Sequence, residues 1–284
     1  MTLVLLLSLK LSVVALILAI GMGSTVADLG YLWRRPHLLW RSLLAMYVLV
    51  PLAALALARF LPVGPGVKAA LLVIAVSAGA PLLPKKLGAF GADAYVFSLV
   101  VTSSLLAIVL VPAWVELLGA HFGLDTEMTP ATVAWAVAKA FLIPLSIGMA
   151  FRAIWPQLGA ALCDRILRFA GLALMICALV LLITHWEVFG RLPWQGTAAL
   201  LSLMLIALAI GHSLGGPEPD NRTALAIACA TRHVGLAMLV ATAFPGPGTV
   251  VLMVSYLLCS MLVSVPYLHW RRRVARGRRP AAAS

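Results

Sequence analysis

The chain has 284 residues, of which 63% are hydrophobic and only 11% are charged, and its mean hydropathy is +1.07. Soluble domains average roughly 45–50% apolar and about 25% charged residues, so these values exclude an ordinary soluble protein and a disordered chain. A helical span needs about 20 apolar residues, so the length allows at most about ten spans with short loops. The sequence therefore predicts a polytopic membrane protein.

Apolar segments follow one another along the chain and predict an all-α fold with about nine transmembrane helices. They cover residues 3–23, 43–61, 67–83, 94–118, 131–151, 166–184, 197–214, 223–244 and 249–270. Glycine and proline occupy the short connections, as is typical of turns. Helices are expected because backbone groups in lipid must form hydrogen bonds within their own segment, and the long apolar runs do not alternate as barrel strands do.

The distribution of basic residues sets the expected orientation. With the N-terminus outside, fifteen of the 21 lysines and arginines fall on the inner side, and only Arg59, Lys68 and Arg191 fall on the outer side. Cytoplasmic regions carry such an excess, so we expect the N-terminus outside and the C-terminus inside a plasma (inner) membrane. The region 271–284 is expected to be a basic cytoplasmic tail that contacts anionic lipid.

Patterns that would indicate an enzyme or a metal site are weak. The four cysteines, Cys163, Cys177, Cys229 and Cys259, form no C-x-x-C pair and are expected to pack as small apolar residues. H-E-x-x-H does not occur, and no two histidines have metal-ligand spacing. The sequence therefore predicts a protein that is not an enzyme and that needs no cofactor.

Ionisable residues remain inside the predicted spans: Lys10, Lys139, Arg232 and His233. Lys10 and Lys139 lie close enough to span ends to extend to the interface. Arg232 and His233 lie in the middle of a segment, where an ionisable side chain costs about 2.5–3.5 kcal/mol on insertion scales and indicates a functional site. Two interpretations of Arg232 can both hold: it bonds to free carbonyls of a broken neighbouring helix, or it binds an anion.

A second interrupted segment lies about half a chain earlier. Pro81 and Pro84 remove backbone donors there, and Lys85 and Lys86 follow directly. A short, Pro- or Gly-interrupted segment in each half of a chain is typical of transporters built from inverted repeats, with the binding site at the breaks. We therefore predict a single transporter domain with repeats over about 1–118 and 131–270.

Several motifs resemble the bile acid:sodium symporter family and follow in order over nearly the whole chain. They are Gly21-Met22-Gly23 with Asp28 and Pro36, Tyr47-Val-Leu-Val-Pro51, Ser103-Ser104-Leu-Leu-Ala107 with Pro112, the stretch from Arg222 to Ala237, and His269-Trp-Arg-Arg-Arg273. The resemblance implies two inverted five-helix repeats, of which this chain lacks the first helix. It also implies two broken helices that cross near the midplane, and a core domain moving against a panel domain formed by the first, fifth and sixth segments.

The same resemblance places sodium ligands at positions whose side chains are unsuitable here. Those positions read Met46, Pro84, Ala228, Arg232 and His233. A guanidinium beside a sodium site repels the ion, so sodium coupling by the family's mechanism is not expected. The hypothesis is that Arg232, with Lys85 or Lys86, replaces sodium, and that His233 couples transport to protons.

The sequence thus predicts a secondary active transporter of a small organic anion, bile-acid-like or another carboxylate, that works by alternating access in a lipid bilayer without nucleic acid. The expected substrate-binding residues are Pro81, Pro84, Lys85, Lys86, Ser103, Ser104, Thr231, Arg232, His233 and Gly235. Arginine suits this role because it can bind a carboxylate through two hydrogen bonds. The alternative is a non-transporting membrane sensor or scaffold that keeps the transporter fold.

Overall fold

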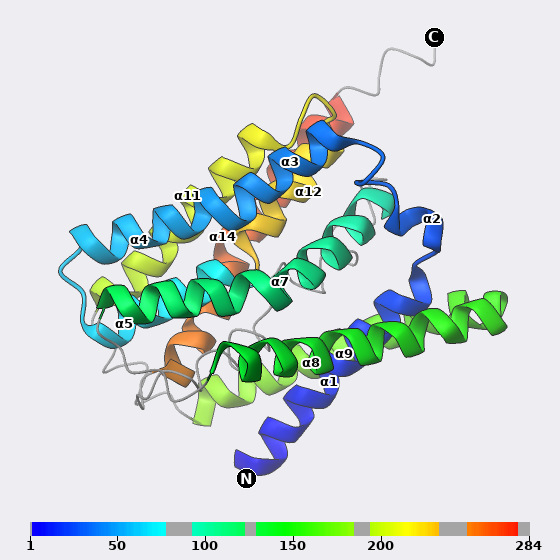
Figure 1. The fold of residues 1–284 in the computed structure, drawn as a ribbon, viewed down its shortest axis with the longest axis horizontal. Coiled ribbons are helices and arrows are strands. Elements are labelled where there is room, and N and C mark those ends of the chain that lie inside the picture. Colours follow the sequence, from blue (N-terminus) through cyan, green and yellow to red (C-terminus); the bar gives the residue numbers. More distant parts are fainter. Residues whose placement is uncertain (1, 78–92, 123–128, 185–193, 233–248, 278–284) are drawn as a thin grey trace.

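The structure, a computed structural model, describes residues 2–77, 93–122, 129–184, 194–232 and 249–277, which form helices and no strand (Figure 1). The elements are α1 (Thr2–Gly23), α2 (Val26–Leu29), α3 (Pro36–Leu44), the π-helical turn η1 (Ala45–Leu49), α4 (Val50–Phe60), α5 (Pro65–Val76), α7 (Asp93–Phe122), α8 (Pro130–Ile154), α9 (Pro156–Thr184), α11 (Trp194–Leu214), α12 (Pro219–Ala230) and α14 (Thr249–Gly277). The predicted all-helical class is therefore confirmed for these residues.

Proline begins several helices, and this moves their starts away from the expected apolar boundaries. The second helical stretch begins at Pro36 rather than residue 43, and α9 begins at Pro156 rather than residue 166. Proline suits the first helical position because its φ is already helical and its missing N–H would have no partner there. Hydropathy marked the apolar part of each helix, whereas proline marks where the helix begins.

The outer surface of the described helices is apolar, as a lipid environment requires. Among the residues that the structure describes, three helical stretches are long and apolar enough to cross a membrane: Pro36–Phe60, Ala94–Trp114 and Trp194–Leu214. Large apolar side chains on their outer faces include Trp40, Phe60 and Trp194, which are 72%, 83% and 75% exposed. Exposing so much apolar surface to water is unfavourable, and acyl chains remove that penalty. The fold is that of a membrane protein.

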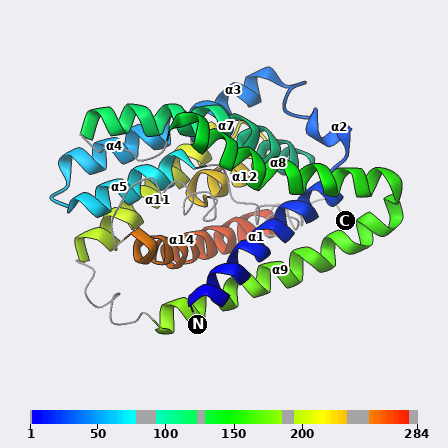
Figure 2. The same cartoon turned by 60° about the horizontal axis from the view of Figure 1, so that its bottom comes forward.

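Helices α1, α8 and α9 lie together on one side of the molecule (Figures 1 and 2). The core between α1 and α9 consists of Leu16, Ala19, Met22, Cys163, Leu167, Ala170 and Leu174, and it is separate from the large core of the other helices. Helix α8 crosses α1 at two glycines. A Cβ on Gly148 would lie 2.1 Å from the Leu18 carbonyl oxygen, and one on Gly21 would lie 2.4 Å from that of Leu145. Only glycine therefore allows this crossing.

Helix α12 packs against α11 and α14. A Cβ on Gly211 would lie 2.5 Å from the Leu225 carbonyl oxygen, so α11 and α12 also touch through their backbones. From α14, Arg271 donates through Nε to Thr223 Oγ1 and through Nη2 to the Pro219 carbonyl oxygen, both at 2.8 Å. Arg271 is 8% exposed. Helix α14 continues to Gly277, so the region expected to be a tail from residue 271 begins as helix. Arginine and alanine favour this continuation of the helix.

The α1–α8 crossing generates a stability prediction. The change Gly148→Ala should lower the free energy of unfolding by about 1–3 kcal/mol, because the added methyl group forces the two backbones apart. The matched control is Gly66→Ala, since a Cβ at Gly66 meets nothing within 4 Å, and alanine there should be neutral or slightly stabilising. Unfolding of both purified variants in detergent measures the difference. Equal stability of the two variants would contradict the tight crossing.

Candidate functional site

Helices α5 and α12 are short and end in the same way. Each has 12 residues and begins at a proline. At 1.5 Å per residue each is about 18 Å long, well short of the roughly 30 Å of a bilayer's hydrocarbon core. Their C-cap residues, Ser77 and Thr231, both leave the helix in an extended conformation, with ψ of 154° and 112°. Both interrupted segments predicted from the sequence thus begin with a half-length helix.

The two C-cap hydroxyls make equivalent hydrogen bonds. Ser77 Oγ donates to the Val73 carbonyl oxygen, and Thr231 Oγ1 donates to that of Ile227, each at 2.7 Å and each four residues back. These bonds cover part of the carbonyl surface that a helix end leaves free. The C-terminal ends still carry partial negative charge, equivalent to roughly half an elementary charge for each helix.

A third interruption lies in η1, where the backbone widens into a π-helical turn just before Pro51. Pro51 has no N–H, so it cannot donate to the carbonyls of Met46 and Tyr47, five and four residues earlier. Side chains from distant helices bond to both groups instead. Trp114 Nε1 donates to the Tyr47 oxygen at 3.2 Å, and Arg232 Nη2 donates to the Met46 oxygen at 2.8 Å. Turns of this kind often occur at functional sites.

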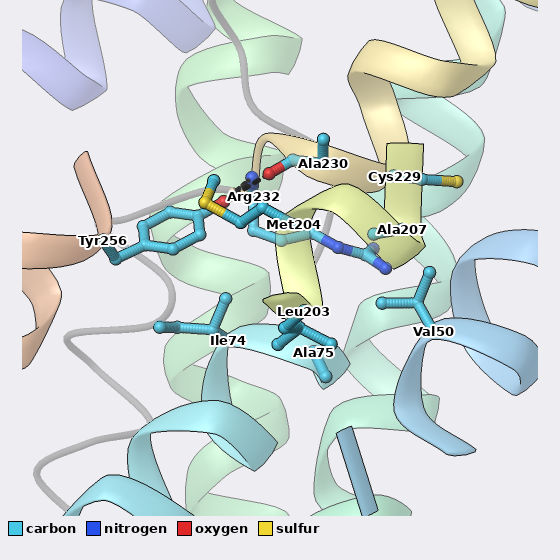
Figure 3. A pocket seen from close by; sticks show the side chains of 10 residues that line it. All are labelled: Val50, Ile74, Ala75, Leu203, Met204, Ala207, Cys229, Ala230, Arg232 and Tyr256. Atoms are coloured by element: carbon cyan, nitrogen blue, oxygen red, sulfur yellow. Dashed lines mark hydrogen bonds between the residues drawn. The ribbon is translucent and has the colours of Figure 1, made fainter. Parts of the chain in front are cut away.

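The Arg232 guanidinium joins the three interruptions. The residue is only 2% exposed, and its Nη1 donates to the Ser77 carbonyl oxygen at 3.0 Å, in addition to the bond to Met46. Its backbone N–H donates to the Tyr256 hydroxyl, which in turn donates to the Ala230 carbonyl oxygen at 3.2 Å. Figure 3 shows the side chain extending away from Tyr256. One residue therefore connects the end of α12 to the end of α5, to η1 and to α14.

Within the described part of the chain, backbone oxygens stabilise the positive charge of Arg232, and no acidic side chain bonds to it. The side-chain partners that the described part of the chain provides are both carbonyls. Nε has no hydrogen-bond partner among the described residues, and Arg232 lines a small cavity. The other lining residues are Val50, Ile74, Ala75, Leu203, Met204, Ala207, Cys229, Ala230 and Tyr256 (Figure 3). Its volume, about 10 Å³, suits one water molecule, whereas small-molecule pockets measure roughly 300–1,000 Å³. Among the described residues, the space beside Arg232 is therefore too small for an organic substrate.

The predicted site residues divide into three groups. Thr231 and Arg232 lie at the break after α12. Ser103 and Ser104 lie buried on α7, where Ser103 Oγ donates to the Val100 carbonyl oxygen at 3.1 Å and Ser104 Oγ has no partner. The Tyr47 hydroxyl donates to the Ser103 carbonyl oxygen and so joins α7 to η1. The remaining ones lie outside the described residues: Pro81, Pro84, Lys85, Lys86, His233 and Gly235.

The positions that the resemblance assigned to sodium ligands are buried where the structure describes them. Met46 and Ala228 are both 0% exposed and belong to the large core. Met46 contributes its backbone oxygen rather than its side chain to the site. Among the cations predicted within spans, Lys10 and Lys139 are exposed, and Lys139 Nζ lies 4.9 Å from the centroid of the Trp135 ring. Arg232, in contrast, is enclosed.

Two contributors were not predicted from the sequence. The Met46 carbonyl is one, and Pro51 is the signal that could have indicated it, because a proline in an apolar helix leaves earlier carbonyls without a donor. The Tyr256 hydroxyl is the other. Nothing in the apolar run of the last segment distinguishes this tyrosine, since only the fold brings α14 beside the end of α12.

One motif match has a structural rather than a catalytic explanation. Residues 211–215 read Gly-His-Ser-Leu-Gly, which fits the G-x-S-x-G spacing of serine hydrolases. That motif requires a sharp turn between a strand and a helix. Here α11 continues through Leu214, and Ser213 Oγ donates to the Ala209 carbonyl oxygen at 2.9 Å. The neighbouring His212 pairs through Nδ1 with the Tyr267 hydroxyl at 2.7 Å.

The Tyr256 contacts generate a second stability prediction. The change Tyr256→Phe should lower the free energy of unfolding by about 1–3 kcal/mol, because it leaves the buried Ala230 oxygen and Arg232 N–H without a partner. The matched control is Tyr31→Phe, since Tyr31 is half-buried and its hydroxyl takes part in none of the hydrogen bonds described for the structure. Denaturant unfolding in detergent compares the two, and an equal loss in both would argue against the Tyr256 bridge.

Comparison with known proteins assigns the chain to a family. Residues 10–190, more than half of the chain, match the model of the Sodium Bile acid symporter family. The match extends from α1 to just beyond α9, so Arg232 and Tyr256 lie after it. No curated protein matches the chain. Together with the apolar helices, the match confirms the predicted membrane, transporter and symporter character. The chain belongs to the sodium bile acid symporter family.

Proposed function

We propose that the protein is a secondary active transporter that carries a small organic anion across a plasma membrane by alternating access. The observation that carries the proposal is the buried Arg232 guanidinium, whose partners among the described residues are two carbonyl oxygens and no carboxylate, where two half-length helices end. A buried ionisable side chain in a membrane protein indicates a substrate or ion pathway. The family match supports the transporter class.

An anionic substrate fits the chemistry of this junction. A guanidinium has five N–H donors, and carbonyls of Ser77 and Met46 take one from each Nη, so donors remain for a carboxylate. Nε is unpartnered and lies beside the cavity. Ser104 Oγ, also buried and unpartnered, is a second polar group that the proposal assigns to the substrate. Ser103, Thr231, Pro81, Pro84, Lys85, Lys86, His233 and Gly235 stay predicted contributors.

Movement of two units relative to each other would give a substrate access to Arg232. We assign the panel domain to α1, α8 and α9, which share a separate apolar core, and the core domain to the remaining helices. Ile17 and Ile20 of α1, with Phe141 and Leu145 of α8, reach the large core and would form the moving interface. The similar ends of α5 and α12 support inverted repeats over about 1–118 and 131–270, within about nine spans.

A sensor or scaffold with the same fold is the alternative, and the free donors of Arg232 are compatible with it as well. Such a protein would bind the anion and change conformation without releasing it on the other side. Flux of the anion across the membrane, rather than binding of the anion, therefore distinguishes a transporter from a sensor.

The uptake prediction tests the transporter directly. Liposomes containing the purified protein should accumulate at least one carboxylate from a panel of a bile acid, pyruvate and pantoate. The change Arg232→Gln should reduce the uptake about ten- to a hundredfold, since it removes a charged hydrogen-bonding group worth about 1.5–3 kcal/mol. Arg59→Gln, on the exposed end of α4, is the matched control and should keep wild-type uptake. Thermal stabilisation by an anion without any flux would favour the sensor.

A labelling prediction tests the proposed orientation, with the N-terminus outside and the C-terminus cytoplasmic. Arg59→Cys and Arg273→Cys both place a thiol at an exposed position, whereas the four native cysteines are buried. A membrane-impermeant maleimide should label Arg59→Cys on intact cells and Arg273→Cys only after permeabilisation. The reverse pattern would invert the topology.

A further inference from the structure

The partners of the Arg232 guanidinium are the kind of groups that bind alkali cations. The carbonyl oxygen of Ser77 belongs to the end of α5, and that of Met46 lacks a helical donor because of Pro51. Carbonyl oxygens at unwound turns and at half-helix C-termini coordinate sodium in transporters, and hard oxygen ligands suit this ion. The family's name includes sodium. In this chain, however, a covalently attached cation already contacts these oxygens.

We propose that the Arg232 guanidinium is a built-in substitute for a bound monovalent cation, and that removing its side chain converts the junction into a binding site for a free one. The guanidinium carries the same single positive charge as sodium. It connects α5, η1 and α12 through backbone oxygens, as a shared cation would. A second cation at these oxygens would meet strong like-charge repulsion.

The consequence concerns the energetics of transport. A tethered cation cannot be released, so this junction contributes nothing to coupling with a sodium gradient. It keeps the helix ends together at any sodium concentration. This consequence for transport rests on the proposed function. The proposal that Arg232 occupies a cation site does not, because unfolding measurements can test it without any transport.

The experiment compares the unfolding temperatures of the full-length protein and of Arg232→Ala in detergent. Each is measured in chloride salts of choline, sodium and methylguanidinium at equal ionic strength. The wild type should unfold at the same temperature in choline and sodium. Arg232→Ala should unfold at a lower temperature in choline, and both sodium and methylguanidinium should raise it by a few degrees in a saturable way, as binding to the folded state requires.

A second arginine provides the matched control. Like Arg232, Arg222 donates to the backbone, but to one carbonyl oxygen only, that of Gly216, through Nε at 3.2 Å and Nη2 at 2.9 Å. Its side chain is only half-buried. Arg222→Ala removes the same charge as Arg232→Ala. The site that it leaves has one carbonyl oxygen, whereas the Arg232 site has carbonyl oxygens from interrupted helices. Neither sodium nor methylguanidinium should raise its unfolding temperature above that in choline.

Two results would overturn the proposal. One is saturable stabilisation of the wild type by sodium, or binding of radioactive sodium to it in liposomes. The other is that Arg232→Ala responds no more to sodium and methylguanidinium than Arg222→Ala does. If Arg232→Ala cannot be purified folded, the wild-type sodium measurements alone decide. Failure of every anion to enter liposomes would reject the proposed function and leave the cation result standing.

Discussion

The hydrogen bonds from the Arg232 guanidinium to the carbonyl oxygens of Ser77 and Met46 are the interaction on which the centre of the structure depends. A charge buried in an apolar interior is costly unless it is fully compensated. Compensation here comes from several weak sources together: two free carbonyls and the negative ends of α5 and α12. Each source exists only because a helix is interrupted at that place. The charge and the three interruptions therefore stabilise one another.

The close packing of α12 explains why Arg232 can reach its partners. Backbone contact at Gly211 sets the distance between α11 and α12, and Arg271 and Tyr256 attach α14 to the two ends of α12. A helix held at both ends and along one side has little freedom to shift. The guanidinium thus projects from a fixed point, which is what a hydrogen-bonded cation between distant segments needs. The same contacts make α11, α12 and α14 suited to move as one unit.

The α1, α8 and α9 group contrasts with this arrangement. Its own apolar core and the glycine crossing at Gly21 and Gly148 make it internally compact, and apolar side chains such as Ile17 and Phe141 join it to the large core. Apolar surfaces can slide with less loss than hydrogen-bonded ones, because dispersion contacts are re-formed at each step. Two groups of helices with apolar contacts between them are compatible with the relative movement that the proposed alternating access requires.

The sequence by itself determined the helical membrane class, the approximate places of the helices and the two short segments, because hydropathy and proline act locally. It also identified Arg232, since a cation in an apolar run stands out whatever the fold. The resemblance to the family rested on motifs spread over nearly the whole chain, and the match over residues 10–190 confirms the membership. The breaks at Ser77 and Thr231 were expected only roughly, since proline positions bound a break without setting its last hydrogen bond.

Only the tertiary structure decided what Arg232 contacts. Its partners Ser77, Met46 and Tyr256 lie 155, 186 and 24 residues away in the sequence, and two of these contribute backbone oxygens, which no side-chain pattern reveals. The same holds for the glycine crossings, where any small residue satisfies the sequence pattern but the distance between two backbones admits glycine alone. Local hydropathy and proline positions determine where the helices form. The packing of the helices against one another determines which distant groups come into contact.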